Sequence, residues 1–402
     1  MTGLPSDSAR ATPAMKVVYS DRVARQFALA TLAWGAFGMA VGLLIALQLA
    51  FWPANLPPYL SFGRMRPVHT TALVFAFAGN MIFAGIYYAS QRLLQVRLPS
   101  PRLAALHFWS WQLVAVAAVL TVPLGHTQGK ELAEMEWPLD LALLGSWLAF
   151  AVHFFWMVRR RNQRRLHPAL WFIIATIAAF TAGHVVNALA VPSGVLDSYS
   201  LFAGVQDAAI HWWYGHGAIT FFLTAPVFGL LYYLLPRAAG QPIHSYRLAI
   251  VHFWGVALLF AGAAPQHLLN TALPDWAQSG GAALGLLLWA PLWAGVLNGL
   301  LTVRAAWSRL RDPVLLFIVA ALLFEGLAAL QAPLLGLKSV SGLAHYTDWT
   351  IGHAHVTALG WTGSWRPPCS TGWCRAFTGP SGTRARPPAR TSTWPWSGSW
   401  ST

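Results

Sequence analysis

The chain has 402 residues, of which 56% are hydrophobic and only 9% are charged. Soluble domains are about one-quarter charged, so this composition excludes an ordinary soluble protein and indicates a lipid bilayer as its surroundings. The formal net charge of +14 does not predict a nucleic-acid partner, because the basic residues lie in short loops between apolar segments and form no basic face.

The N-terminal segment, residues 1–26, carries four basic residues ahead of the first long apolar stretch: Arg10, Lys16, Arg22 and Arg25. It has no short apolar region followed by a small-residue cleavage site. We therefore expect a cytoplasmic lead-in and no signal peptide.

Nine apolar segments of about 20 residues follow, which is the length that an α-helix needs to cross a bilayer. They lie near 27–52, 68–92, 104–124, 139–158, 169–192, 207–235, 247–271, 280–304 and 314–336, and a tenth begins near 349. Backbone polar groups cannot stay unpaired in lipid, so these segments must be helices. The sequence predicts an all-α, polytopic bundle of about ten transmembrane helices over residues 27–364.

The loops predict the orientation of the bundle, because Arg and Lys are enriched on the cytoplasmic side of a membrane. The loops after the second, fourth, sixth and eighth segments are rich in arginine, for example at 159–165, whereas most acidic residues lie in the other loops, for example at 131–136. We expect a bacterial inner-membrane protein with a cytoplasmic N-terminus.

Five histidines on four of these segments reach one slab in the outer half of the membrane at about 1.5 Å of rise per helical residue. They are His69, His216, His267, His353 and His355. A lone histidine near a helix end is usually interfacial, but five at one depth favour a shared site. Both cysteines, Cys369 and Cys374, lie in the C-terminal tail, so metal chemistry must use imidazole, which suits iron and copper. A haem site is the natural candidate.

The pair in IGHAHVT, His353 and His355, is separated by one residue, so on a helix the two rings point about 200° apart. They cannot bind one metal together, but each can ligate a different haem on opposite sides of the helix. His69 is then a candidate for the second axial ligand of one haem. The other haem keeps an open face toward His216 and His267.

From about Tyr19 to Trp361 the chain resembles the catalytic subunit of cbb3-type cytochrome c oxidases, in the haem–copper superfamily. The resemblance is carried by FGRMRPVHT, GHTQGKELAEMEWPLD, AGVQDA, WWYGHGA, TALPDWAQ and HYTDWTIGHAH. It implies two b-type haems, with His69 and His355 on the low-spin haem and His353 on the high-spin haem. It also implies copper on His216 and His267, and calcium near the haem propionates at Glu131.

The resemblance further implies reduction of dioxygen to water with electrons from cytochrome c, delivered by partner subunits that carry c-type haems. Protons are then taken from the cytoplasmic side, and Thr224, Tyr232, Tyr233 and Ser245 are candidates to line their path.

The seventh segment departs from the family pattern, which has a tyrosine and, after four residues, Pro-His-His. This chain reads FAGAAPQH, with Phe260 in place of the tyrosine and Gln266 in place of the first histidine. Phenylalanine has no hydroxyl to give during O–O cleavage, and an amide oxygen is a weaker ligand than imidazole for cuprous copper. These two positions bear directly on catalysis and leave the copper site open.

A second departure is FEGLAALQAP, where Glu325 and Gln331 stand in place of a tyrosine and a glutamate. Glu325 is a candidate proton relay or metal ligand. Nitric oxide reductases of the superfamily lack the tyrosine, use non-haem iron beside the high-spin haem and require glutamates. A nitric oxide reductase-like paralogue and a non-catalytic haem-binding membrane protein therefore stay open as alternatives.

After Ser364 the sequence loses all apolar periodicity, with prolines, arginines, serines and tryptophans over 365–402. We expect a disordered tail that resembles a translated frameshift. Family members continue the tenth helix and add about two more, so we expect a shortened tenth helix of about three turns that holds its haem ligands loosely.

Overall fold

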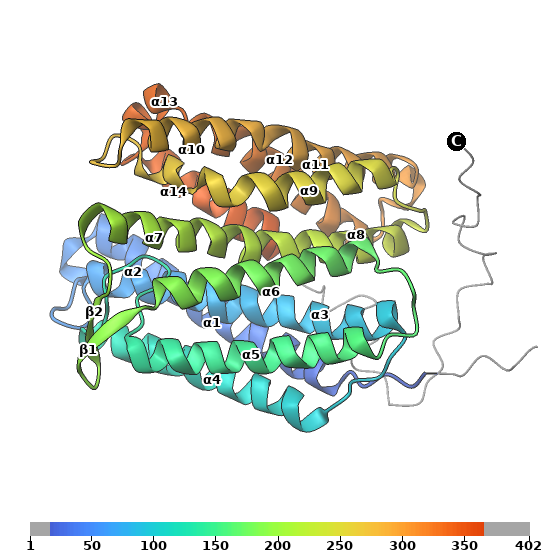
Figure 1. Ribbon diagram of the computed structural model, residues 1–402, viewed down its shortest axis with the longest axis horizontal. Helices are drawn as coiled ribbons and strands as arrows, with labels where there is room; N and C mark the ends of the chain where they lie inside the picture. Colours follow the sequence, from blue (N-terminus) through green and yellow to red (C-terminus); the bar gives the residue numbers. More distant parts are fainter. Residues whose placement is uncertain (1–16, 366–402) are drawn as a thin grey trace, which may run out of the picture. The chain divides into compact units, whose positions relative to one another are not determined.

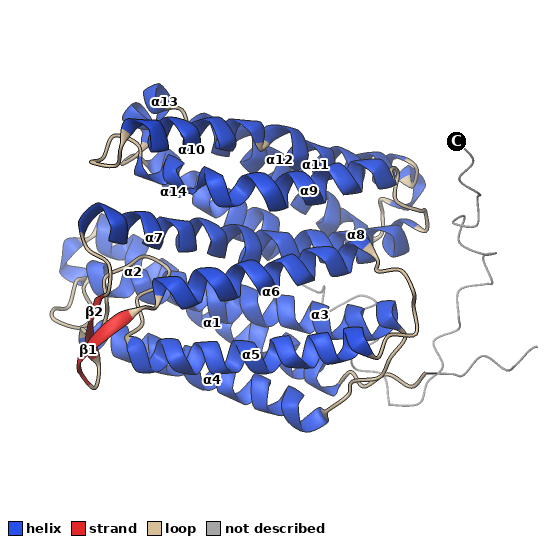
Figure 2. Ribbon diagram, in the orientation of Figure 1, coloured by secondary structure: helices blue, strands red, loops and turns tan. Residues whose placement is uncertain are grey.

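The computed structural model describes residues 17–365, so the predictions for residues 1–16 and for almost the whole tail lie outside the described part of the chain. Within residues 17–365, nine helical segments are long and apolar enough to cross a membrane. The all-α, multi-pass architecture is confirmed (Figures 1 and 2).

The nine segments contain short changes of helix type. They are Arg22–Ala50 (α1); Phe62–Thr71, Ala72–Ala78 and Gly79–Leu94 (α2, η2, α3); Pro101–Leu124 (α4); Trp137–Arg159 (α5); Pro168–Asn187 (α6); Gly204–Gly217, Ala218–Thr224 and Ala225–Ala239 (α7, η3, α8); Tyr246–Ala263 and Ala264–Leu268 (α9, η4); Asp275–Leu287 and Trp289–Arg304 (α10, α11); and Pro313–Leu335 (α12). Then come Lys338–Ala344 (α13), Asp348–His355 (α14), Val356–Thr362 (η6) and Gly363–Trp365 (η7).

The structure differs from the predicted elements in the bounds of several helices, including the second segment, which begins at Phe62 rather than at residue 68, and in one added hairpin. The first helix begins at Arg22 rather than at residue 27, and α6 ends at Asn187 rather than near 192. After α6 the chain forms an antiparallel hairpin, Ala190–Gly194 (β1) with Asp197–Ser200 (β2), which the sequence did not predict. The hairpin lies beside the start of α7 (Figure 2).

Most helices pack against one that is near them in the sequence. The helix α4 lies against α5, α6 against α8, and α9 against α11, while α12 contacts both α11 and η6. Figure 1 shows α9 to α12 together, with α7 and α8 next to them. The helix α14, which carries His353 and His355, continues directly into η6, and η6 packs on α12.

Glycines allow several of these helices to approach closely, as is usual where lipid provides no hydrophobic force between helices. A Cβ added at Gly85 of α3 would lie 2.4 Å from Leu230 Cδ1 of α8, and one added at Gly255 of α9 would lie 2.4 Å from Pro291 Cβ of α11. The first contact fixes the spacing of α3 and α8. The second fixes the spacing of α11 and α9, the helix that carries Phe260.

Gly255→Val should destabilise the bundle by about 1–3 kcal/mol, because the added methyl groups overlap Pro291 in a packed contact. The measurement is the thermal unfolding midpoint of the detergent-solubilised protein. Gly280→Val in α10 is the matched control, since a Cβ there meets no atom within 4 Å. Equal midpoints for the two variants would contradict this view of α9 packing.

Candidate haem and metal site

His69 lies in α2 against a glycine face of α1. Its Nδ1 is 2.9 Å from the carbonyl oxygen of Gly38, and a Cβ at Gly42 would lie only 2.5 Å from His69 Cε1. A carbonyl only accepts hydrogen bonds, so the neutral ring donates from Nδ1 and keeps its Nε2 lone pair for a metal. The glycine face thus both receives the ring and orients it.

The two histidines of α14 show the same tautomer by different partners. His355 donates from Nδ1 to Ile351 O at 2.8 Å, within its own helix, and His353 donates from Nδ1 to Gln331 Oε1 of α12 at 3.3 Å. His355 lies within electrostatic reach of His69. His353 therefore contacts α12, whereas His355 bonds within its own helix, so the two rings have separate surroundings.

His216 of α7 and His267 of η4 meet directly, with 2.7 Å between His216 Nδ1 and His267 Nε2. Trp212 stacks on the His267 ring at 4.6 Å and 11°, and Phe260 stacks on the His216 ring at 3.8 Å and 23°. His353 lies within electrostatic reach of His267. The structure thus brings His216 and His267 into contact, with His353 in electrostatic reach of His267. His69 and His355 lie in electrostatic reach of each other.

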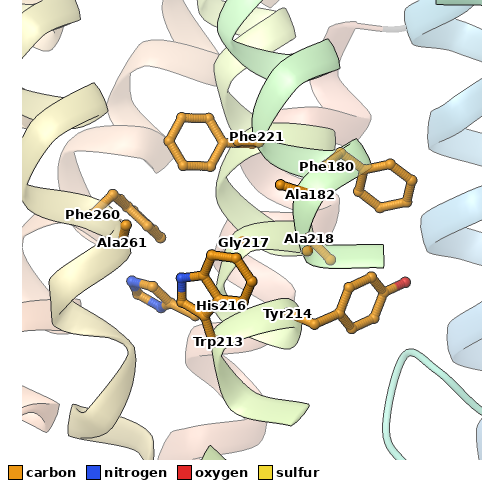
Figure 3. Close-up of a pocket in the computed structure, with 12 residues that line it drawn as sticks. Phe180, Ala182, Trp213, Tyr214, His216, Gly217, Ala218, Phe221, Phe260 and Ala261 are labelled. Atoms are coloured by element: carbon orange, nitrogen blue, oxygen red, sulfur yellow. The ribbon is translucent and has the colours of Figure 1, made fainter. Parts of the chain in front are cut away.

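A small pocket of about 60 Å³ lies on the other side of His216, between α6, the α7–η3 helix and α9. Figure 3 shows Phe260 and Ala261 on one side of it and Phe180 and Ala182 on the other, with His216 below. Alanines, glycines and aromatic rings supply most of its lining. Such a dry space suits a small apolar molecule rather than a charged one.

Three π-helical segments follow the predicted ligands closely. Ala72–Ala78 begins three residues after His69, Ala218–Thr224 two residues after His216, and Val356–Thr362 one residue after His355. Isolated π turns are rare and are enriched at functional sites. Their coincidence with these histidines is an observation that sequence periodicity did not provide.

Two residues of the seventh predicted segment replace family residues. Phe260 lies in the site, and Gln266 contacts other helices. The amide oxygen of Gln266 lies beside Gly285 of α10 and Gly336 at the end of α12. It is buried without a hydrogen-bond partner. Among residues 17–365, no group of three or more His, Cys, Asp or Glu side chains is placed to hold a metal ion.

Glu325 is buried within α12, and its Oε2 has no hydrogen-bond partner in the structure. It precedes Gln331, the partner of His353, by six residues, which is about 9 Å along the helix. A buried carboxyl without a partner is costly in an apolar bundle, so it is a candidate functional group, although it does not contact the histidines directly.

A polar group near the end of α8 and the start of α9 was only partly predicted. Tyr232 Oη lies 3.0 Å from His252 Nδ1, and Asn298 of α11 accepts from the backbone N–H of Ser245 at 2.8 Å. The Ser245 hydroxyl itself accepts from Leu248 N as a helix cap. His252 and Asn298 were missed because each, taken alone, is an ordinary buried polar residue.

The loop at 125–136 holds a cluster of acidic residues outside the membrane-spanning segments. Glu131 pairs with Arg66 at 2.8 Å, and Ser198 of β2 donates to Glu136 at 2.6 Å. Glu134 accepts from Leu132 N at 3.1 Å and is almost fully buried. Burial raises the pKa of Glu134 to about 7, while that backbone hydrogen bond acts in the opposite direction.

The fold and the paired histidines define a multi-pass membrane haem protein of the haem–copper oxidase class. Residues 22–379 match the family model described as Cytochrome C and Quinol oxidase polypeptide I. The chain belongs to this family. The predicted family resemblance and the assignment as an oxidoreductase are confirmed.

The chain is 49% identical over 351 residues to cbb3-type cytochrome c oxidase subunit CcoN1 of Stutzerimonas stutzeri, covering 87% of this chain and 74% of that protein. It is 44% identical to cytochrome c oxidase subunit 1 of Rhodobacter capsulatus, covering 86% and 66%. A haem–copper terminal oxidase dimer solved by cryo-electron microscopy has the same fold, with a TM-score of 0.72 at 13% identity, over 86% of this chain and 66% of that one.

Family membership implies haem and copper binding. The residues fit haem, because His69, His353 and His355 each have Nδ1 bonded and Nε2 left for iron. They fit copper only in part, because the distal position has two imidazoles and no third ligand among the described residues.

Gly42→Val should displace the His69 ring, since even a Cβ would lie 2.5 Å from Cε1. We expect loss or broadening of the low-spin haem absorption in the purified protein, measured by difference spectroscopy and electron paramagnetic resonance. Gly145→Val, where a Cβ meets nothing within 4 Å, is the control. Unchanged low-spin spectra in Gly42→Val would contradict the placement of haem at His69.

Glu134 should make stability depend on pH. Its raised folded pKa means that the folded protein binds a proton more tightly than the unfolded chain, so stability falls as pH rises from about 4.5 to about 7 and then levels off. Glu134→Gln should remove this part of the slope. The check is the unfolding midpoint of both proteins across that range, and identical slopes would show that Glu134 is not the responsible group.

Proposed function

We propose that this chain is the haem-carrying subunit of a cbb3-like terminal oxidase that reduces dioxygen to water. The observation that carries the proposal is the arrangement on α14, where His355 lies within electrostatic reach of His69, and His353 within electrostatic reach of His267. One helix thus carries candidate ligands for two b-type haems, which would lie close enough together to exchange electrons.

In this proposal His69 and His355 hold the low-spin haem and His353 holds the high-spin haem. Bound haem supplies the redox chemistry, and the chain supplies orientation and exclusion of water. Gln331 fixes the His353 ring through its amide oxygen, and Trp212 and Phe260 close the distal pair with apolar surface. The pocket beside His216 has a mostly apolar lining and would offer dioxygen a position next to the distal pair of His216 and His267.

Protons would enter from the cytoplasmic ends of α8, α9 and α11. Tyr232 and His252 form a hydrogen-bonded pair there, and Asn298 links α11 to the start of α9. A polar route through these residues would lie on the side that the arginine-rich loops predict to be cytoplasmic. Tyr233, by contrast, lies under the Arg237 guanidinium at 4.1 Å and is better explained as packing.

The electron donor in this proposal is cytochrome c, acting through partner subunits that carry c-type haems. The support is the printed name of the Stutzerimonas stutzeri relative, a cbb3-type cytochrome c oxidase subunit. Calcium at Glu131 stays a prediction, with Arg66 as the partner of that carboxylate in the described structure.

Nitric oxide reduction is the second candidate, favoured by two features of the chain. The ring that stacks on His216 belongs to Phe260 and carries no hydroxyl, and Glu325 provides a buried carboxyl on α12. A non-haem iron beside the high-spin haem is the metal that this candidate implies.

The test uses the complex purified with its partner subunits and supplied with reduced cytochrome c. We expect oxygen consumption in an oxygen electrode, its loss in His353→Ala and its retention in His244→Ala, a change at an exposed residue of the cytoplasmic loop. Turnover of nitric oxide without oxygen consumption would favour the second candidate, and absence of both with haem present would reject the enzymatic proposal.

A further inference from the structure

The side chain of Gln266 occupies a gap between two glycines. A Cβ added at Gly285 would lie 2.0 Å from Gln266 Oε1, and one added at Gly336 would lie 2.6 Å from the same atom. Real Cβ atoms do not approach an oxygen this closely, so both positions accommodate the amide only because they are glycines. The amide group is therefore embedded between α10 and the end of α12.

The backbone of η4 is held on the same face. A Cβ at Gly281, one helical turn before Gly285, would lie 2.7 Å from the backbone nitrogen of Gln266 and 2.8 Å from Pro265 Cβ. Gly281 and Gly285 thus form a groove on α10 that receives η4. Because backbone and side chain of Gln266 both fit into this groove, its amide has a defined position between α10 and the end of α12.

The distal pair lacks the geometry of a three-ligand site. At metal–nitrogen distances of about 2.0 Å, two nitrogens of a tetrahedral site are about 3.3 Å apart. His216 Nδ1 and His267 Nε2 lie 2.7 Å apart, so they must separate before both bind one ion. Stacking by Trp212 and Phe260 holds each ring from one side. A third imidazole from position 266 would have to come from the segment that lies in the α10 groove.

We propose that, among residues 17–365, the distal metal position has only two protein ligands, His216 and His267, and that Gln266 is a packing residue between α10 and α12 instead of the third ligand. With one ligand fewer, the site retains copper weakly. This inference rests on the proposed function only in using haem as the marker of an intact complex, and haem is measured separately in each sample.

The first experiment measures copper, iron and haem in the purified complex after dialysis against a cuprous chelator. We expect the wild-type complex to lose most of its copper while keeping both haems, and Gln266→Ala to lose copper to the same extent, because the amide takes no part in binding the metal. Gln241→Ala, the same substitution at an exposed loop residue, is the matched control and should change nothing.

Chelator-resistant copper at one equivalent per high-spin haem in the wild type, lost in Gln266→Ala, would overturn the proposal and make Gln266 a ligand. Absence of haem from the wild-type complex would instead count against the proposed function.

The second experiment tests the packing role without reference to metal. Gly285→Val places two methyl groups where the Gln266 amide lies and should lower the unfolding midpoint of the complex. Adding Gln266→Ala vacates that space and should restore most of the loss, because substitutions at touching residues are not additive. Additive losses in the double variant would show that Gln266 lies elsewhere and would contradict the proposal.

Discussion

The site depends on which acceptor each imidazole N–H finds in an apolar bundle. A neutral ring carries one N–H, and burying that group without a partner costs free energy, so one nitrogen must be bonded before the other can be offered to iron. His69 uses a backbone carbonyl of α1, His355 one of its own helix, and His353 the Gln331 amide. Three unrelated partners therefore produce the same ring state. The distal pair is the exception, because His216 and His267 bond to each other, and this explains why the haem positions look prepared while the neighbouring metal position does not.

Small residues make these partners reachable. The carbonyl of Gly38 is open to His69 because Gly42, one turn further along α1, has no side chain to occupy the volume of the ring. The same principle operates on α10, whose glycines accept η4 and the amide of Gln266. Close backbone contact through glycine is a general means of helix association in lipid. Here it has two different results, since one glycine face orients a ligand and the other holds a potential ligand away.

The sequence predicts the helices well, because a span must be long and apolar and its backbone must bond within itself. It also singled out His69, His216, His267, His353 and His355, because ionisable residues are rare at membrane depth. The structure brings His216 and His267 together, and the haem and metal roles of all five stay predictions. It did not predict the hairpin after α6, whose short strands carry no strong alternation, or the pairing of Tyr232 with His252, which depends on contact between helices. The direction of Gln266 is likewise a tertiary property, as glycines on another helix decide it.

The π-helical segments divide three of the helices into parts that are out of phase. A π turn contains more residues than an α turn, so side chains beyond it are rotated about the helix axis relative to those before it. The outer part of each helix can therefore direct a histidine toward the centre while the inner part directs a different stripe toward its neighbours. The two parts are thus free to diverge in sequence independently. A deletion of one residue within Ala72–Ala78, Ala218–Thr224 or Val356–Thr362 would leave both halves helical yet turn their faces against each other.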